Sequence, residues 1–410
     1  MTKPTQRFMA LEGLRGVAAL MVVVYHFIAL FFPAMRNGNM DLAHTRYEQH
    51  LYGTPVTLFF SGGLGVAIFF VLSGFVLSIG FFRTGNQSIV VKLATGRYLR
   101  LMIPALASVL LAWIIIQFGA HELTNAAGQL GNSEELARKW SKNPSLFEVI
   151  KAGVYDIFVE YKPKSRAVNH PLWTMHVEFV GSFIVFGFLL LFARSRYRWI
   201  SYLALVLAFV DTWYLGFIIG VAIADAYNLG WFEKLKRWYF TVPVFAIAIA
   251  LAMYPKKNVD ETLYRYLDLS HFGVRERDLY LTLSAVLIML VVLLSKWVGG
   301  FLGTRFMAAL GRYTFSLYLT HVFVIYTVAS AVVIWLAEPL GYGKAVGVAA
   351  LISAPVFWIV SYLFERYVDA PSIRIAKYVG SLYRGEHALN RPKFMRPIGS
   401  QTQPEPPSQE

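Results

Sequence analysis

The stretch MALEGLRGVAALMVVVYHF, residues 9–27, is a long apolar run that carries an arginine and a histidine. A membrane-spanning helix rises about 1.5 Å per residue and needs roughly 20 apolar residues to cross a ~30 Å hydrocarbon core. Similar runs recur at short intervals as far as residue 365. The stretch therefore predicts the first span of an all-α, polytopic membrane helix bundle.

Composition supports this class. Of the 410 residues, 57% are hydrophobic and only 15% are charged, which is outside the usual balance of a soluble domain. The chain has no cysteine, so disulfides and an acyl-cysteine intermediate are excluded. We expect one transmembrane domain over residues 1–380. Residues 381–410 have the Pro, Gln and Glu bias of a disordered, here cytoplasmic, tail.

About ten runs are expected to form transmembrane helices. The fifth and sixth are short and meet at Asp211, so they either cross separately or form one hairpin. The runs cover residues 14–33, 58–82, 101–118, 174–193, 199–210, 213–228, 239–254, 279–295, 313–337 and 345–365.

The charges predict an orientation. With the N-terminus inside, 22 of the 38 lysines and arginines fall in inner segments, whereas the outer segments carry 15 basic and 15 acidic residues. The positive-inside rule then places both termini in the cytoplasm and the loops 119–172 and 255–278 outside. Residues 146–158 are expected to form an amphipathic helix in the first of these loops. The basic residues form no continuous stripe, so nucleic acid is not expected as a partner. The expected partner is the lipid bilayer.

Several ionisable groups lie inside the predicted spans, where they are costly unless paired or functional. Arg15 and His26 are 11 residues apart, which places them on one helix face and about 16.5 Å apart along the axis. Counted from the ends of their own spans, Glu178, His321 and Ser73 reach a similar depth. A histidine beside a carboxylate suits general-base catalysis, so His26, Glu178 and His321 are the catalytic candidates. The alternative is a snorkelling arginine and a histidine bonded to a neighbouring helix.

A second cluster of candidates suits a phosphate ligand. In ATGRYLRLMIP, Arg97 and Arg100 stand at i and i+3 at a predicted helix start, and Arg15 is a possible third donor. We assign these arginines and Ser73 to binding a substrate that carries phosphate. Two arginines before a span are also typical topology anchors, and Ser73 beside Gly74 is also typical of helix packing.

Two further stretches contain residues that are candidates for contacts with a second substrate. NHPLWTMHVEF places His170, Trp173 and Thr174 near the outer interface, and of these we assign Trp173 and Thr174 to substrate binding. Such a tryptophan is ordinarily an aromatic-belt residue, but above Glu178 it would also form the floor of a sugar-sized pocket. Tyr318, in YTFSLYLTH, is a further substrate-binding candidate.

These motifs together resemble acyltransferase family 3, integral membrane acyltransferases common in bacteria. MALEGLRGVAALMVVVYHF carries that family's arginine, ten residues, histidine pattern, and the likeness continues in order over about residues 8–378. It rests also on FFVLSGFVLS, RYLRLMIPA, LWTMHVEF, YTFSLYLTH and FERYVDAPS.

The resemblance implies ten spans, a cytoplasmic acyl-CoA donor, and acylation of sugars in surface or exported glycans. It implies that His26 is catalytic, that Arg15 is essential, and that Arg97 and Arg100 form the third-span arginine motif. Glu178 matches the family's tryptophan, hydroxyl residue, glutamate pattern, although His176 departs from it. The chain resembles the stand-alone form without a fused esterase-like domain.

We therefore expect an acyl-CoA dependent O-acyltransferase of the bacterial inner membrane, with acetyl-CoA as the expected donor substrate and a carbohydrate or other hydroxyl acceptor. No permanently bound cofactor and no metal are expected. Transfer is expected to be direct, with His26 as base; the rival is a ping-pong route through Ser73, Thr174 or His26. A transporter that relays protons through His26, Glu178 and His321 is the alternative function, and a structural or sensory protein is a third. The sequence leaves the acceptor, the acyl length and the oligomeric state open.

Overall fold

The computed structural model describes residues 4–133, 144–160, 169–235, 238–255, 259–269, 271 and 274–382. All regular secondary structure within these ranges is helical. Seven helical segments are long and apolar enough to cross a membrane, and three apolar helices are shorter. The predicted all-α polytopic bundle is thus confirmed, whereas the number of ten spans stays a prediction.

The long helices are α1 (Pro4–Phe31), α4 (Gly62–Thr84), α5 (Gln87–Gln117), α10 (Trp173–Leu191), α14 (Glu276–Leu294), α16 (Arg305–Val324) and α18 (Tyr342–Phe364). The shorter apolar helices are α11 (Arg198–Phe209), α12 (Tyr214–Asn228) and α13 (Trp238–Ala252). The remaining α-helices are α2 (Pro33–Asn37), α3 (Arg46–Leu51), α6 (Ala120–Leu130), α8 (Leu146–Lys151), α9 (Ile157–Val159), α15 (Lys296–Leu302), α17 (Ser330–Leu340) and α19 (Ala370–Leu382).

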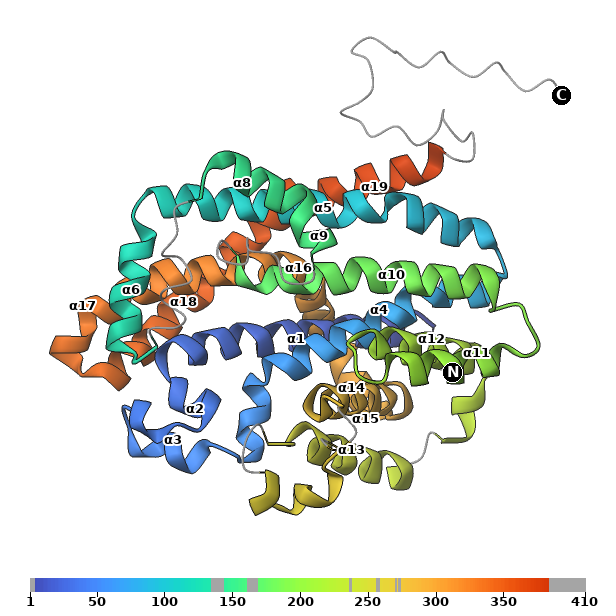
Figure 1. Ribbon diagram of the computed structural model, residues 1–410, viewed down its shortest axis with the longest axis horizontal. Helices are drawn as coiled ribbons and strands as arrows, with labels where there is room; N and C mark the ends of the chain where they lie inside the picture. Colours follow the sequence, from blue (N-terminus) through green and yellow to red (C-terminus); the bar gives the residue numbers. More distant parts are fainter. Residues whose placement is uncertain are drawn as a thin grey trace, which may run out of the picture.

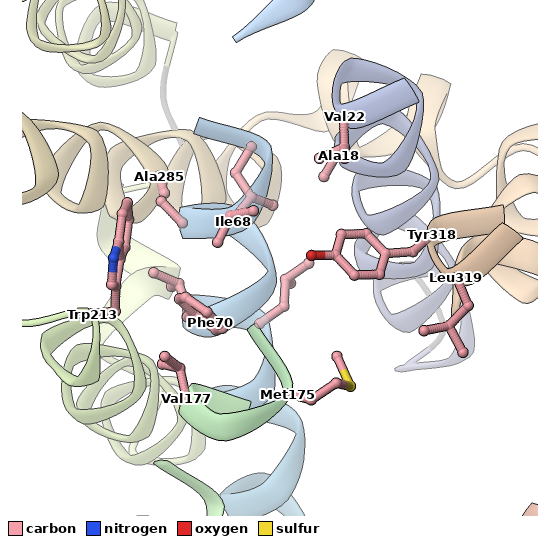
Figure 2. Packing of buried hydrophobic residues seen from close by; sticks show 14 of the residues in the cluster. Ala18, Val22, Ile68, Phe70, Met175, Val177, Trp213, Ala285, Tyr318 and Leu319 are labelled. Atoms are coloured by element: carbon pink, nitrogen blue, oxygen red, sulfur yellow. The ribbon is translucent and has the colours of Figure 1, made fainter. Parts of the chain in front are cut away.

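Helix α4 is the centre of the bundle. It packs against α1, α5, α10, α12 and α14, and most of its side chains are buried. Helices α1, α4, α5 and α10 run roughly alongside one another, while α2, α3, α6 and α17 gather near the end that α1 reaches at its C-terminus (Figure 1). Apolar side chains from α1, α4, α10, α12, α14 and α16 fill the interior between them (Figure 2).

Several helices extend beyond the apolar runs that predicted them. The third span was expected to begin near residue 101, but α5 begins at Gln87, where the Asn86 side chain accepts a hydrogen bond from the Ser88 amide at 3.0 Å. The prediction that Arg97 and Arg100 mark a helix start is therefore wrong, because both lie inside α5. A hydropathy pattern detects only the apolar part of a helix, whereas capping and polar contacts continue it further.

Three helices contain π-helical turns. One, at Ile325–Ala329, joins α16 to α17, and another, at Glu365–Asp369, joins α18 to α19. The third, Ala152–Asp156, joins α8 to α9, so the helix predicted over residues 146–158 is confirmed. Residues 383–410 of the predicted tail lie outside the described residues.

Glycines set the approach of α1 to α16. A Cβ atom at Gly311 would lie 2.2 Å from the Glu12 carbonyl oxygen, and one at Gly16 would lie 2.7 Å from Leu310 Cβ. Small residues at such crossings let helix backbones come close together. The two helices run in the same direction from this crossing, which brings His26 of α1 beside His321 of α16.

Candidate active site

A pair of histidines lies where α1 meets α16. His321 Nε2 is 3.2 Å from His26 Nδ1, and the two ring centroids are 4.9 Å apart. His321 is fully buried, whereas His26 is partly buried. A third histidine, His170, has its ring centroid 6.1 Å from that of His26. The predicted residues His26 and His321 thus form one direct contact.

The hydrogen-bond partners assign the tautomers of this pair. His321 Nδ1 lies 3.1 Å from the Leu317 carbonyl oxygen, which only accepts, so Nδ1 carries the proton and Nε2 the lone pair. His26 Nδ1 lies 2.9 Å from the Val22 carbonyl oxygen, so it also carries its proton and can donate to His321 Nε2. A neutral His26 then keeps its lone pair on Nε2, which is the atom that a general base uses.

His26 lines a cavity of about 550 Å³, which we call the histidine cavity. Its wall is aromatic and polar, and it includes His170 and Trp173. The volume is within the range of about 300–1,000 Å³ that is usual for small-molecule sites. Other residues that line it are Tyr25, Arg36, Tyr52, Trp213, Tyr254, Tyr264, Arg277, Asp278 and Tyr318.

A second, smaller cavity of about 180 Å³ lies beside it, which we call the arginine cavity. Three of its lining residues are the predicted donor arginines, and Glu178 is the one carboxylate among its described lining residues. Its electrostatic character is therefore cationic. The residues that line it include Arg15, Ser73, Arg97, Arg100, Thr174, Glu178, Phe315 and Tyr318.

Glu178 forms the centre of a polar network in the arginine cavity. Its Oε1 atom accepts from Ser73 Oγ at 2.8 Å and also bonds to the Arg97 guanidinium. Arg97 Nε donates to Ser182 Oγ at 2.8 Å, and Ser182 donates in turn to the Glu178 carbonyl oxygen. Sequence reasoning offered Glu178 or His321 as the partner of His26; His321 makes that contact, whereas Glu178 bonds to Arg97 and Ser73.

The other two arginines also have carboxylate partners. Arg100 bonds to Asp369 at 2.5 Å and to Ser372 Oγ at 3.1 Å, and its guanidinium stacks over Phe315 at 4.9 Å. Arg15 bonds to Glu12 at 3.2 Å, but Glu12 is 41% exposed. A guanidinium has five N–H donors, so each arginine retains donors for a ligand.

Tyr318 stands between the two cavities, both of which Val66 also lines, and Thr174 contacts the Tyr318 hydroxyl. Tyr318 lines both, and its hydroxyl lies 2.7 Å from Thr174 Oγ1 and 2.8 Å from the Pro171 carbonyl oxygen. Its side chain projects from α16 into the middle of the bundle, toward α4 and α10 (Figure 2). We call Tyr318 and Thr174 the partition. The predicted acceptor residues are therefore divided: Trp173 lines the histidine cavity, Thr174 the arginine cavity, and Tyr318 both.

Four residues of the site were not selected from the sequence. His170 stands three residues before Trp173 in a stretch that was quoted, and Asp369 lies in the FERYVDAPS run. Arg36 and Arg277 were counted with the charge-balanced outer segments, where sequence alone does not separate a cavity residue from a surface one. A signal for Arg277 was its position at the start of an apolar run, since a charge there is either an anchor or a site.

A helix bundle with a buried histidine pair and a cationic cavity beside it has the parts of a membrane-embedded enzyme. Residues 9–364 match the family model described as an acyltransferase domain, so the chain belongs to acyltransferase family 3 and is an acyltransferase. It is 24% identical to the O-acetyltransferase PaAT-1 of Phomopsis amygdali, in a match that covers 90% of this chain and 83% of that one. No solved structure matches the chain.

Proposed function

We propose that this enzyme transfers an acyl group, expected to be acetyl, from acyl-CoA to a hydroxyl of a carbohydrate or similar acceptor, with His26 as general base. One observation carries the proposal: His26, bonded to the buried His321, faces one cavity, and a cluster of arginines lines a second cavity on the other side of Tyr318. The similarity to an O-acetyltransferase favours acetyl transfer to oxygen.

The arginine cavity is the proposed donor site. CoA carries phosphates, and arginine is well suited to phosphate because its planar guanidinium donates two parallel hydrogen bonds. The cavity volume of about 180 Å³ is too small for a whole CoA molecule. We therefore assign the phosphates to the mouth of the cavity near Arg15 and Arg100, and the acyl end of the pantetheine arm to its interior beside Tyr318.

The histidine cavity is the proposed acceptor site. A hydroxyl group beside His26 would donate its proton to Nε2 as its oxygen attacks the thioester carbonyl carbon. The tetrahedral intermediate then collapses, the carbon–sulfur bond breaks, and the thiolate of CoA takes the proton from His26. An ester and free CoA result, and His26 returns to its neutral form. A positioned base of this kind typically contributes about 10²- to 10⁴-fold to the rate.

His321 is the proposed positioning residue for that base. Its Nε2 atom accepts from His26 Nδ1, which holds the imidazole in the tautomer with the lone pair on Nε2. This hydrogen bond becomes charge-assisted when His26 takes the proton, so it strengthens as the reaction proceeds. Catalysis gains from an interaction that is stronger in the transition state than in the ground state.

The partition must open for the reaction to occur. The thioester in the arginine cavity and the hydroxyl in the histidine cavity are separated by the Tyr318 ring, whose hydroxyl is held by Thr174 and the Pro171 carbonyl. We propose that rotation of the Tyr318 side chain joins the cavities when both substrates are bound. With both termini cytoplasmic, the donor would enter from the cytoplasmic side and the acceptor from the other side.

A ping-pong route is the rival mechanism. Ser73 is its best candidate nucleophile because its Oγ donates to Glu178 Oε1 at 2.8 Å, and a carboxylate can activate a hydroxyl. The same Glu178 oxygen also accepts from the Arg97 guanidinium, however, so it is already engaged in an ion pair. The direct route is therefore preferred.

The test uses the purified protein in detergent with acetyl-CoA labelled in the acetyl group and a panel of neutral and charged glycosides. We expect release of CoA together with label on a glycoside, loss of both in His26→Ala, and unchanged turnover in His50→Ala, an exposed histidine outside the cavities. Normal turnover in a folded His26→Ala would refute the base. Stoichiometric label on the denatured protein without acceptor would establish the ping-pong route instead.

A further inference from the structure

The histidine cavity has two arginines in its wall that the acyl-transfer chemistry does not use. Arg36 and Arg277 come from different parts of the chain and both are partly buried. Arg36 Nε donates to the Tyr25 hydroxyl at 3.1 Å. Arg277 interacts electrostatically with Tyr25, Asp278 and Tyr52. Tyr25 is the residue before His26, and their ring centroids are 5.1 Å apart.

The Arg277 guanidinium interacts electrostatically with Asp278, but one of its N–H groups, the buried Nε, has no hydrogen-bond acceptor in the described part of the chain. Its Nη1 atom lies 4.0 Å from the position that a Cβ would take at Gly63, so the guanidinium reaches back toward α4. A buried N–H group without an acceptor is unfavourable, and an anionic ligand would supply the missing acceptor.

The carboxylate in this cavity does not neutralise the two arginines. Asp278 is the one acidic residue among the described residues that line it. Asp278 is 3.6 Å from Arg275, which does not line the cavity and also pairs with Asp211 at 3.5 Å, so Asp278 is shared between Arg275 and Arg277. The cavity wall around Tyr25 is therefore cationic, while the aromatic side chains of Tyr52, Trp173 and Tyr264 suit the apolar faces of a sugar ring.

We propose that the acceptor is an anionic carbohydrate, whose carboxylate or phosphate binds Arg277 and Arg36 while a hydroxyl of the same molecule reaches His26. The inference rests on the proposed function, because it names the class of molecule that the histidine cavity takes. Binding of the anionic group to the two arginines sets the orientation of the sugar, so that one hydroxyl, and not its neighbours, faces His26. Arg277 is then a specificity-determining residue rather than a catalytic one.

The test measures binding by calorimetry in detergent, independently of turnover. The probes are 4-nitrophenyl β-D-glucuronide, which carries a carboxylate, glucose 1-phosphate, which carries a phosphate, and 4-nitrophenyl β-D-glucoside as the neutral reference. We expect the wild type to bind one anionic probe or both about 10- to 150-fold more tightly than the glucoside, which is the usual range for hydrogen bonds to a charged group. The stronger of the two anionic probes identifies the group.

Variants locate the effect. Arg277→Gln should lower the affinity for the preferred anionic probe to that for the glucoside, Arg277→Lys should retain part of the preference, and Arg265→Gln, which removes an equal charge at an exposed site, should retain all of it. Equal or undetectable binding of all three probes by the wild type would overturn the proposal, as would a preference that survives in Arg277→Gln. If the wild type prefers an anionic probe but transfers no acetyl group from acetyl-CoA, the proposed function is refuted and the anion-binding proposal is not.

Discussion

Replacing His321 tests whether this residue positions His26, while His26, the proposed general base, is left unchanged. His321→Leu keeps a buried side chain of similar size but removes the acceptor that lies 3.2 Å from His26 Nδ1. His321→Gln retains an acceptor oxygen that can occupy nearly the same place. The prediction is that kcat falls strongly in the leucine variant and only modestly in the glutamine variant, while KM for both substrates changes little.

The magnitude follows from what happens to this hydrogen bond during catalysis. It is an ordinary bond when His26 is neutral and a charge-assisted one when His26 holds the acceptor's proton. A hydrogen bond to a charged group contributes about 1.5–3 kcal/mol and an ordinary one about 0.5–1.5 kcal/mol, so losing the difference of about 1–1.5 kcal/mol corresponds to about a 5- to 13-fold decrease in kcat. The Val22 carbonyl still accepts from His26 Nδ1 in this variant, so the tautomer is retained and the loss is limited to the bond with His321.

The assay is initial-rate CoA release in detergent, with melting temperature as the control for folding. Equal rates for His321→Leu and the wild type would refute the role of His321, and so would equal losses in the leucine and glutamine variants. A raised KM with unchanged kcat would move His321 from positioning the base to binding a substrate.

Three further predictions concern the donor, the helix crossing and the topology. Arg15→Ala should weaken CoA binding about tenfold or more in calorimetry and leave glycoside binding unchanged. Substitution of Arg97 or Arg100 is less suitable, because it would leave the carboxylate of Glu178 or Asp369 without its arginine partner. Unchanged CoA affinity in Arg15→Ala would contradict the assignment of Arg15 to the donor site. Gly311→Val should lower the melting temperature, because its Cβ would meet the Glu12 carbonyl at 2.2 Å, whereas Gly347→Val in open space serves as the control, and equal effects would dismiss the close crossing. Ile150→Cys, on a chain without native cysteine, should react with an impermeant thiol reagent from outside the cytoplasm; labelling only from the cytoplasmic side would reverse the orientation.

The histidine pair shows how far sequence reasoning reaches. Counting residues from Arg15 and from Arg312 places His26 and His321 at similar depths, and the structure brings them into contact. Depth is one coordinate, however, and it leaves open which helices are neighbours. Glu178 was assigned a comparable depth, yet it bonds to Arg97 on the other side of the partition. The glycines at the crossing of α1 and α16 allow these two helices to pack closely. A single sequence does not indicate which helix such glycines contact.

The arginines show a second limit of the same kind. Arg97 and Arg100 were recognisable as a pair, but their carboxylate partners lie far along the chain in α10 and in the turn before α19. Their charges are therefore partly neutralised within the protein, which the spacing of two residues cannot reveal. Arg277 is the opposite case: nothing in its local sequence distinguishes it from a topology anchor, and only the cavity gives it a function.

The two cavities have the same sign of charge, and the partition between them is neutral. The arginine cavity is lined by three guanidinium groups, whose carboxylate partners are Glu178, Asp369 and Glu12, and the histidine cavity is lined by two guanidinium groups and Asp278, which is shared with Arg275. In both cavities, guanidinium N–H groups remain to donate to an anion. Each cavity thus attracts an anionic group and holds it away from the centre. Tyr318 and Thr174, which carry no charge, occupy the place where an uncharged thioester and an uncharged hydroxyl would meet. With the proposed donor and acceptor bound, this arrangement would keep the donor phosphates and the acceptor anion apart, so that their mutual repulsion would not oppose the approach of the reacting atoms. It also predicts that a neutral acceptor leaves Arg277 uncompensated, which connects the selectivity of the acceptor to the charge of the cavity rather than to contacts at the reacting hydroxyl.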